Sequence, residues 1–297
     1  MTSYRLTFIT PLFSKGSYDD RPEVRPSSIR GQLHWWFRAL GGNYADEKAV
    51  FGGVHNGATA SKVVVRVANV TGQTAEIPTL PHKFGGQASP KCAYRPGTTA
   101  EVHFALRLGG LDERLAAMLD RTIEAWLLVG TLGLRATRAG GSFVWEPLTA
   151  NGVGMPGTLE DYAARCRTVL RGAPLRFVLS PKPFPSAEAA RRVVSDTLGG
   201  RDDPRGVNDL KKLRDPLGKV FGGRKTSPLR FRIIQLGEVF HIAAVWDDRS
   251  AVTGNKPGDF KAVVDLLASR DKEIGRLLQA ALGSSGTTNN PTLHPFP

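Results

Sequence analysis

The feature that most restricts the fold is the order of strand-like and helix-like patterns in the first half of the chain. Four runs have the strand signature of alternating or short, turn-bounded apolar residues, and two repeat apolar residues every three or four positions, as helices do. The strand-like runs are 4–9, 61–70, 100–108 and 142–146, and the helix-like runs are 27–40 and 111–129. The order β-α-β-β-α-β predicts a ferredoxin-like unit, an architecture that many RNA-binding modules share.

The second half of the chain repeats part of this order. Its expected elements are a strand at 174–180, a helix at 186–198, a hairpin at 227–246 that turns near Gly237, and a helix at 259–282. No run indicates a fourth strand. The tetrapeptide VFGG occurs at 50–53 and again at 220–223, each time before a serine that opens a basic strand. The same match in the same topological position favours two related units.

The expected fold is therefore α+β, with two ferredoxin-like (RRM-like) units in tandem and long loop insertions. We expect the N-terminal unit at 1–150 and the C-terminal unit at 151–283, joined by the Gly- and Pro-rich stretch EPLTANGVGMPGTLED. Residues 284–297 lack periodicity, which predicts a mobile tail. The region 80–97 is expected to be a basic loop that acts as a finger over a bound strand.

The charge balance points to a polyanionic partner. The chain of 297 residues has a formal charge of +13, which favours nucleic acid ahead of an anionic membrane, with an uncommitted basic surface as the alternative. No stretch reaches the roughly 20 apolar residues of a membrane span, and the N-terminus has no secretory signal pattern. Cys92 and Cys166 are too few for a disulfide framework or a zinc site. We expect a reduced, cytoplasmic protein with no cofactor and no membrane contact.

The stretch RPSSIRGQLHWWFRALGG, 25–42, predicts a helix with an apolar side and a basic side. On a helical wheel, one face collects the apolar residues Ile29, Leu33, Trp36, Phe37 and Leu40. Arg30, His34 and Arg38 follow each other at intervals of four on a neighbouring stripe, and Trp35 lies outside both. The two arginines suit phosphate contacts or surface salt bridges equally well. Trp35 is a candidate for stacking on a base.

The start of this helix is a candidate anion site. Ser27 or Ser28 is expected to cap the helix, and Arg25 precedes it. Free backbone N–H groups in a first helical turn, together with an arginine, attract phosphate groups.

A second candidate site is the loop GTLGLRATRAGGSF, 130–143. Its four glycines allow the backbone to approach a ligand closely, and Arg135 and Arg138 supply charge. The loop has no GK[ST] and follows a helix, so it is neither a Walker loop nor a dinucleotide fingerprint. An RNA-backbone cradle and a long flexible connection are the two interpretations. A third basic segment, GKVFGGRKTSPLR, contains Lys219, Arg224, Lys225 and Arg230.

Signals for catalysis are weaker. The six histidines are scattered, and none lies in a metal-binding spacing such as HExxH. The cluster of Asp19, Asp20 and Glu23 favours a solvated loop over a metal site. We expect a protein that is not an enzyme, while a metal-independent ribonuclease that uses a histidine remains an alternative. A scaffold that meets an acidic protein partner is the third hypothesis.

Four motifs in this order, TPLFSKG, RPSSIRGQLHWWFRALGG, VFGG before SKVVVRV, and GTLGLRATRAGGSF, resemble the RAMP superfamily of CRISPR effector subunits, and within it the first subunits of type III-B (Cmr) complexes. The resemblance covers roughly residues 4–146. It implies RRM-like units and a non-catalytic subunit in an antiviral ribonucleoprotein. It also implies contact with the 3′ part of the crRNA, the 5′ part of the target RNA and other RAMP subunits.

The resemblance and the charge pattern together select the expected RNA contacts. These are Arg25, Ser27, Arg30, His34, Trp35, Arg38, Lys62, Arg135, Arg138, Arg224 and Lys225. His34 stands where the family often has another basic residue, so this contact is weaker when the imidazole is neutral. No catalytic residue and no metal ligand is expected. The hypothesis requires the early helix and the later loop to meet along one sugar-phosphate track.

Overall fold

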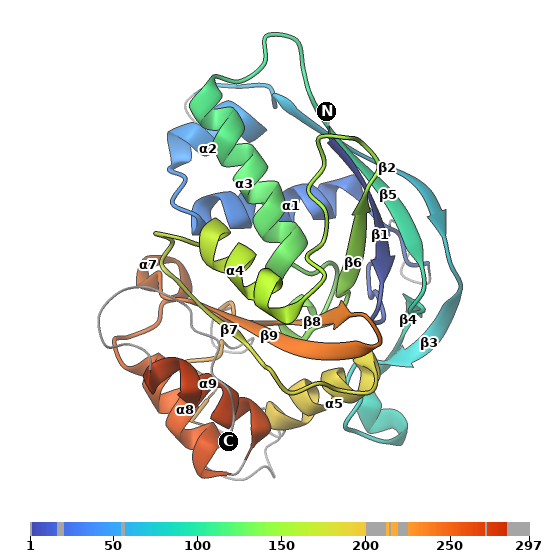
Figure 1. Ribbon diagram of the computed structural model, residues 1–297, viewed down its shortest axis with the longest axis vertical. Helices are drawn as coiled ribbons and strands as arrows, with labels where there is room; N and C mark the ends of the chain where they lie inside the picture. Colours follow the sequence, from blue (N-terminus) through green and yellow to red (C-terminus); the bar gives the residue numbers. More distant parts are fainter. Residues whose placement is uncertain are drawn as a thin grey trace.

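A computed structural model describes residues 2–16, 21–54, 57–199, 212–213, 215–218, 225–270 and 272–283. The described residues form a four-stranded and a three-stranded antiparallel sheet with helices packed against them, and a separate two-stranded ribbon (Figure 1). The expectations for Asp19, Asp20, Lys219, Arg224, the second VFGG and the tail at 284–297 lie outside the described residues.

The first sheet has the strand order β2-β5-β1-β6, with all neighbours antiparallel. Its strands are β1 (Thr2–Phe8), β2 (Val63–Thr71), β5 (Thr99–Leu106) and β6 (Phe143–Pro147). Helices α1 (Pro26–Ala39) and α3 (Glu113–Val129) cover one face of this sheet (Figure 1). Each helix connects two strands that have another strand between them. The β-α-β-β-α-β order expected for the first half is therefore the order that the structure has.

Between β2 and β5 the chain forms a two-stranded ribbon that the sequence did not indicate. It consists of β3 (Thr74–Pro78) and β4 (Pro90–Tyr94), which pair antiparallel and enclose a 3₁₀ turn at Gly85–Ala88. The side chains of β3 alternate between exposed and half-buried positions. Because neither face of this ribbon is fully covered, its sequence lacks the apolar alternation on which strand prediction depends.

Two further helices lie outside the main sequence expectations. These are α2 (Tyr44–Phe51) and α4 (Leu159–Val169). Each begins at a residue whose side chain accepts a hydrogen bond from the third residue after it: Asn43 from the Asp46 N–H and Thr158 from the Asp161 N–H. Such caps stabilise a helix by about 1 kcal/mol. The cap at Asn43 is the sequence feature from which α2 could have been predicted, because the apolar residues of α2 show almost no helical periodicity.

The second sheet has the order β7-β9-β8. It contains β7 (Leu175–Leu179), β8 (Leu229–Leu236) and β9 (Val239–Asp247), and β8 turns into β9 at Gly237 with φ +58°. Helix α5 (Ala187–Thr197) follows β7 in the chain, and the short α7 (Ser250–Thr253) follows β9. The helix expected at 259–282 is two helices, α8 (Asp259–Ser269) and α9 (Glu273–Gly283). The described part of the second half thus repeats β-α-β-β with helices in the place of a fourth strand.

The second sheet separates two hydrophobic cores. One core joins α1, α3 and the first sheet to α4 and to one face of the second sheet, and the other joins the opposite face to α5, α8 and α9 (Figure 1). Side chains of β8 point to both cores. Ile234 and Leu236 enter the first core, on the side of α1 and α3, and Phe231 and Ile233 enter the second, on the side of α5, α8 and α9. The described helices include none that is long and apolar enough to cross a bilayer.

Candidate nucleic-acid interface

Helix α1 begins earlier than the sequence suggested. Arg25 is the N-cap residue and Pro26 is the first helical residue, so Ser27 and Ser28 lie inside the first turn and neither caps it. A proline forces the residue before it into an extended conformation, which fixes the boundary at Arg25. No side chain caps this turn. Ser27 is exposed, and Arg25 is half-buried.

The basic stripe of α1 faces α2. The guanidinium of Arg30 donates a hydrogen bond to the carbonyl oxygen of Phe51, the last residue of α2. The Nδ1 of His34 lies 2.6 Å from an Oε1 of Glu47, and its ring packs on Phe51 at 4.4 Å between centroids. Both side chains hold α1 against α2, and the phosphate contacts expected at Arg30 and His34 stay predictions.

Arg38 differs from the other two residues of the stripe. Its Nε lies 3.6 Å from the same Glu47 carboxylate, and 53% of its side chain remains exposed. A long ion pair with this exposure leaves most of its N–H groups facing solvent. Arg38 is the most exposed member of the stripe and the one best placed to contact a phosphate.

Trp35 is not a free stacking platform. The guanidinium of Arg230, on β8, lies 3.7 Å from the centroid of its indole ring, and that of Arg249 lies 5.5 Å away. Trp35 also packs edge-to-face against Trp36. The base contact expected at Trp35 stays a prediction, and an arginine already covers one face of the ring. The indole joins α1 to the second sheet through cation–π contacts.

The glycines of the 130–143 loop mainly serve its packing on the chain's own backbone. Gly133 has φ +87°, and a Cβ there would lie 2.5 Å from the Phe13 carbonyl oxygen. The Leu134 N–H donates to that same carbonyl, and the Gly141 N–H donates to the Pro11 carbonyl. A segment of 10–14 that follows β1 thus fills the space that was expected for a ligand.

The two arginines of this loop lie around a 3₁₀ turn, Ala136–Arg138, and both engage in interactions within the protein. Arg135 is exposed and has left-handed backbone with φ +61°, whereas Arg138 is half-buried. They lie close enough to Arg191 and His82, respectively, to lower the pKa of each, although burial is the larger cause in both cases. Positive charge therefore gathers where this loop meets α5.

The other basic positions are distributed more widely. Lys62 is half-buried, and its backbone links α2 to the first sheet through the Lys62 N–H to the Val50 carbonyl. Lys225 is half-buried near α7, with its Cε 3.6 Å from the position of a Cβ on Gly254. Arg224 lies outside the described residues.

Strand β8 connects the two candidate segments. Arg230 and Arg232 are two residues apart, so they point to the same side of the sheet. Arg230 stacks on Trp35 of α1, and Arg232 donates hydrogen bonds to the carbonyl oxygens of Gly130 and Phe143 at the two ends of the loop. The early helix and the later loop thus both pack against one face of β8. The alternating arginines of PLRFRI were the sequence signal for this connection.

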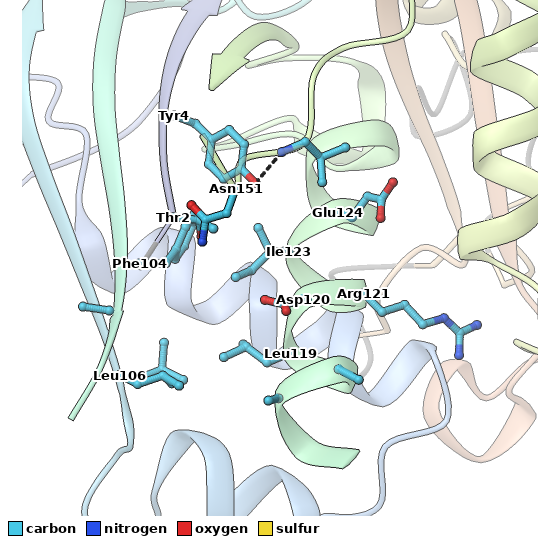
Figure 2. Close-up of a pocket in the computed structure, with 15 residues that line it drawn as sticks. Thr2, Tyr4, Phe104, Leu106, Leu119, Asp120, Arg121, Ile123, Glu124 and Asn151 are labelled. Carbon is cyan, nitrogen blue, oxygen red and sulfur yellow. Dashed lines mark hydrogen bonds between the residues drawn. The ribbon is translucent and has the colours of Figure 1, made fainter. Parts of the chain in front are cut away.

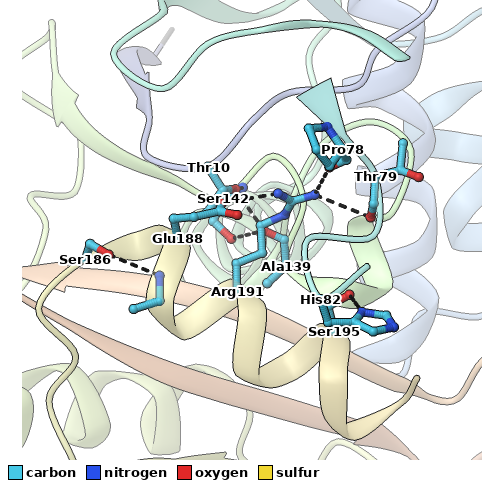
Figure 3. Close-up of polar contacts among 11 residues, drawn as sticks. Thr10, Pro78, Thr79, His82, Ala139, Ser142, Ser186, Glu188, Arg191 and Ser195 are labelled. Atoms are coloured by element: carbon cyan, nitrogen blue, oxygen red, sulfur yellow. Dashed lines mark hydrogen bonds and ion pairs between the residues drawn. The ribbon is translucent and has the colours of Figure 1, made fainter. Parts of the chain in front are cut away.

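The base of the β3–β4 ribbon is fixed to α5 rather than free to move over a ligand (Figure 3). Arg191 is 2% exposed and donates to the carbonyl oxygens of Pro78 and Thr79, with Glu188 as its ion-pair partner. The Nδ1 of His82 lies 2.7 Å from the Ser195 hydroxyl oxygen. Beyond these anchors Phe84 is 82% exposed, an aromatic residue that sequence reasoning did not single out.

A cavity of about 600 Å³ lies between the first sheet and α3 (Figure 2). Tyr4, Phe104 and Ile123 line it, together with the carboxylates of Asp120 and Glu124. Burial raises the pKa of Asp120, and Glu124 is paired with Arg165. Two acidic groups and one arginine, Arg121, line the cavity, so it lacks the excess of positive charge that a phosphate backbone requires.

The described histidines are engaged in separate local contacts and are not gathered in a metal-binding group. His103 contacts the Ser3 hydroxyl and His241 contacts the Ser180 carbonyl, as ordinary sheet residues do. In the part of the chain that the structure describes, no three His, Cys, Asp or Glu side chains gather as a metal site.

Comparison with known proteins finds a family match in the first half of the chain. The RAMP superfamily model matches residues 5–144. Over 72 residues the chain is 38% identical to the CRISPR system Cmr subunit Cmr1-2 of Pyrococcus furiosus, a match that spans 21% of this chain and 37% of that relative.

Similar solved structures extend the likeness in fold along the chain. The crystal structure of apo Cmr1 from Pyrococcus furiosus superposes with a TM-score of 0.58 at 18% identity, over 91% of this chain and 96% of that one. A chain of the type III-B Cmr-beta complex bound to cognate target RNA gives 0.60 at 11% identity, over 90% and 98% of the two chains. Residues 5–144 thus match the RAMP superfamily, and the fold of the chain is similar to that of Cmr1.

Proposed function

We propose that this chain is a non-catalytic, RNA-binding subunit of a type III-B CRISPR effector complex. It contacts the 3′ part of the crRNA and the 5′ part of the target RNA, mainly through phosphates. Its partners are these RNAs and other RAMP subunits. The likeness to Cmr1 and to a chain of a Cmr complex bound to target RNA supports the assignment, as does the formal charge of +13.

The observation that carries the proposal is the meeting of two arginine-bearing segments on β8. The exposed or half-exposed cations in and around them are Arg25, Arg38, Lys62, Arg135, Arg138 and Lys225, to which Arg224 is added from the sequence. Backbone phosphates bind such scattered cations with little base specificity. The proposal keeps the division into units at 1–150 and 151–283, each derived from a ferredoxin-like module.

RNA binding in the presence of EDTA tests the proposal against both rivals. We expect the full chain to retain a labelled CRISPR repeat RNA on a filter and to leave it intact. Discrete cleavage that is lost in His34→Ala or His82→Ala would assign a metal-independent ribonuclease instead. A dissociation constant weaker than about 100 μM at low salt would favour a scaffold for an acidic protein, because even non-specific nucleic-acid binding is usually tighter.

A further inference from the structure

In the described part of the chain, Arg230, which stacks on Trp35, has no carboxylate of its own, although the charge of Asp247 partly offsets its burial. Arg249 binds Asp247 in a bidentate pair, with Nε to Oδ1 at 2.9 Å and Nη2 to Oδ2 at 2.7 Å. Asp247 is 1% exposed, and its carboxylate is occupied by this pair and by the Arg249 N–H. Among the described residues, no carboxylate forms an ion pair with Arg230.

One N–H group of Arg230 is left without a hydrogen-bond acceptor. Its Nε is enclosed and has no hydrogen-bond partner. Burial lowers the pKa of Arg230 to about 10, so the group stays charged at neutral pH but loses part of its solvation. The Trp35 ring compensates for only part of that loss, because a cation–π contact is weaker than a bidentate ion pair. Proteins rarely keep a desolvated guanidinium without an anionic partner.

The surface beside this group is open and positively charged. Ser28, Gly31, Trp35 and Arg38 form one stripe of α1, since they follow each other at intervals of three, four and three residues. A Cβ added at Gly31 would meet nothing within 4 Å. Lys225 lies near α7, the helix that directly follows Arg249. An extended polyanion can therefore approach Arg230 along the bare backbone of α1.

We propose that Trp35, Arg230 and Arg249 form a phosphodiester-binding subsite, the Trp35 subsite, in which the indole holds Arg230 so that its N–H groups meet one backbone phosphate of single-stranded RNA. This inference rests on the proposed function and assigns part of the RNA contact to the second half of the chain. Arg230 binds the phosphate, while Trp35 and Asp247 position the two guanidiniums. A planar guanidinium stacked on a ring can donate two parallel hydrogen bonds to a pair of phosphate oxygens, which the ammonium group of a lysine cannot do.

The test compares Arg230→Met with two matched variants of the full chain. Arg232→Met removes the neighbouring arginine on the same side of β8, whose two Nη groups donate to carbonyl oxygens inside the protein. Arg165→Met removes an exposed arginine of α4 that is paired with Glu124. The probe is a fluorescently labelled oligouridylate, and its anisotropy is followed from about 50 to 200 mM salt. Thermal unfolding of each variant is measured in parallel.

We expect Arg230→Met to weaken RNA binding about tenfold, the loss of one charge-assisted hydrogen-bonded contact. The slope of log K against log salt should become shallower by about 0.7, the value for one phosphate on a single strand. The melting temperature should be unchanged or higher, because an unpaired buried charge has been removed. Arg165→Met should change neither the RNA affinity nor the salt slope, and Arg232→Met should lower the melting temperature.

Three results would overturn the subsite. The first is an unchanged RNA affinity and salt slope in Arg230→Met. The second is a lower melting temperature in Arg230→Met with RNA affinity restored fully by Arg230→Lys, since a lysine cannot reproduce the stacked fork. The third is a polyglutamate affinity that falls in Arg230→Met while the oligouridylate affinity does not. That result would identify an acidic protein as the partner.

Two further measurements distinguish free phosphate from RNA as the ligand, and failure of the Trp35 subsite from failure of the proposed function. Inorganic phosphate is added as a competitor at a concentration that supplies the same number of phosphate groups as the oligouridylate. If it displaces the oligouridylate, the site binds free phosphate, and the RNA subsite is contradicted. Wild-type protein that fails to bind the oligouridylate would reject the proposed function itself. Wild-type binding that Arg230→Met leaves intact would reject the subsite alone.

Discussion

The guanidinium of Arg232 donates a hydrogen bond of 2.5 Å to the carbonyl oxygen of Gly130. Gly130 ends α3 and opens the arginine-bearing loop, whereas Arg232 belongs to the second sheet. Arg232 is 1% exposed and stacks on Phe143, with its centre 4.4 Å from the ring centroid. The carbonyl groups at the end of a helix carry partial negative charge, which partly compensates this buried cation. The second half of the chain thus fixes the loop of the first half.

Replacement of Arg232 by methionine should destabilise the whole fold. The Gly130 and Phe143 carbonyl oxygens would lose their donor inside the core, and a buried carbonyl without a partner carries a desolvation cost. We expect the free energy of unfolding, measured in urea, to fall by about 2–4 kcal/mol. A loss below half a kcal/mol would show that the loop does not depend on this contact.

Arg30 and Arg38, eight residues apart on α1, should respond differently to replacement by methionine. Arg30→Met removes the donor to Phe51 and should lower stability by about 1 kcal/mol with no change in the salt dependence of RNA binding. Arg38→Met should leave stability nearly unchanged and make the salt slope shallower by about 0.7. Unfolding curves and anisotropy titrations measure both effects. The reverse pattern would restore Arg30 as the RNA contact.

The protein should lose stability as pH falls below about 6.5. Burial lowers the pKa of both His82 and His241, whereas in the unfolded chain a histidine titrates near 6.5. Between the lowered pKa and 6.5, the unfolded state therefore binds more protons than the folded state, so the free energy of unfolding rises with pH in this window. Urea unfolding at about pH 7.5 and pH 5.5 measures the difference.

The control for this pH effect is the double variant His82→Asn with His241→Asn. An asparagine amide can still donate a hydrogen bond in the place of Nδ1 but does not titrate. We expect the double variant to show a smaller loss of stability between the two pH values than the wild type does. Equal losses in both proteins would assign the pH dependence to other groups.

The two cysteines should differ in reactivity. Burial raises the pKa of the Cys166 thiol, which lies inside the first core, and only the thiolate reacts quickly with disulfide reagents. Cys92 is half-buried on β4. We expect a thiol reagent to modify one cysteine in the native protein and both in urea. Rapid modification of Cys166 in the native state would contradict the packing of α4.

Sequence patterns predicted the first sheet well because its strands and helices each bury one continuous face. Phe104 on β5 and Trp126 on α3 show this, since both lie at the periodic positions that enter the core. The β3–β4 ribbon and α2 were harder to predict because their stability depends on hairpin pairing and on the cap at Asn43. The break between α8 and α9 leaves the apolar periodicity on both sides of it intact, which explains the single helix expected there.

The site was predictable only in part, for a physical reason. A helical wheel places Arg30, His34 and Arg38 on one stripe but does not reveal that α2 brings Glu47 against it. In the same way, the sequence shows an arginine at 230 without showing that it meets Trp35 across the chain. Charge and spacing identify the segments that carry cations. Tertiary contacts decide which of those cations are neutralised within the fold.

Photo-crosslinking in an assembled type III-B complex that contains guide and target RNA tests the central claim most directly. Crosslinked nucleotides would be located on peptides of this chain by mass spectrometry. We predict crosslinks both in α1, around Trp35 and Arg38, and in the loop at 130–142. Crosslinks confined to the acidic cavity side of α3, or none on this chain, would contradict the account.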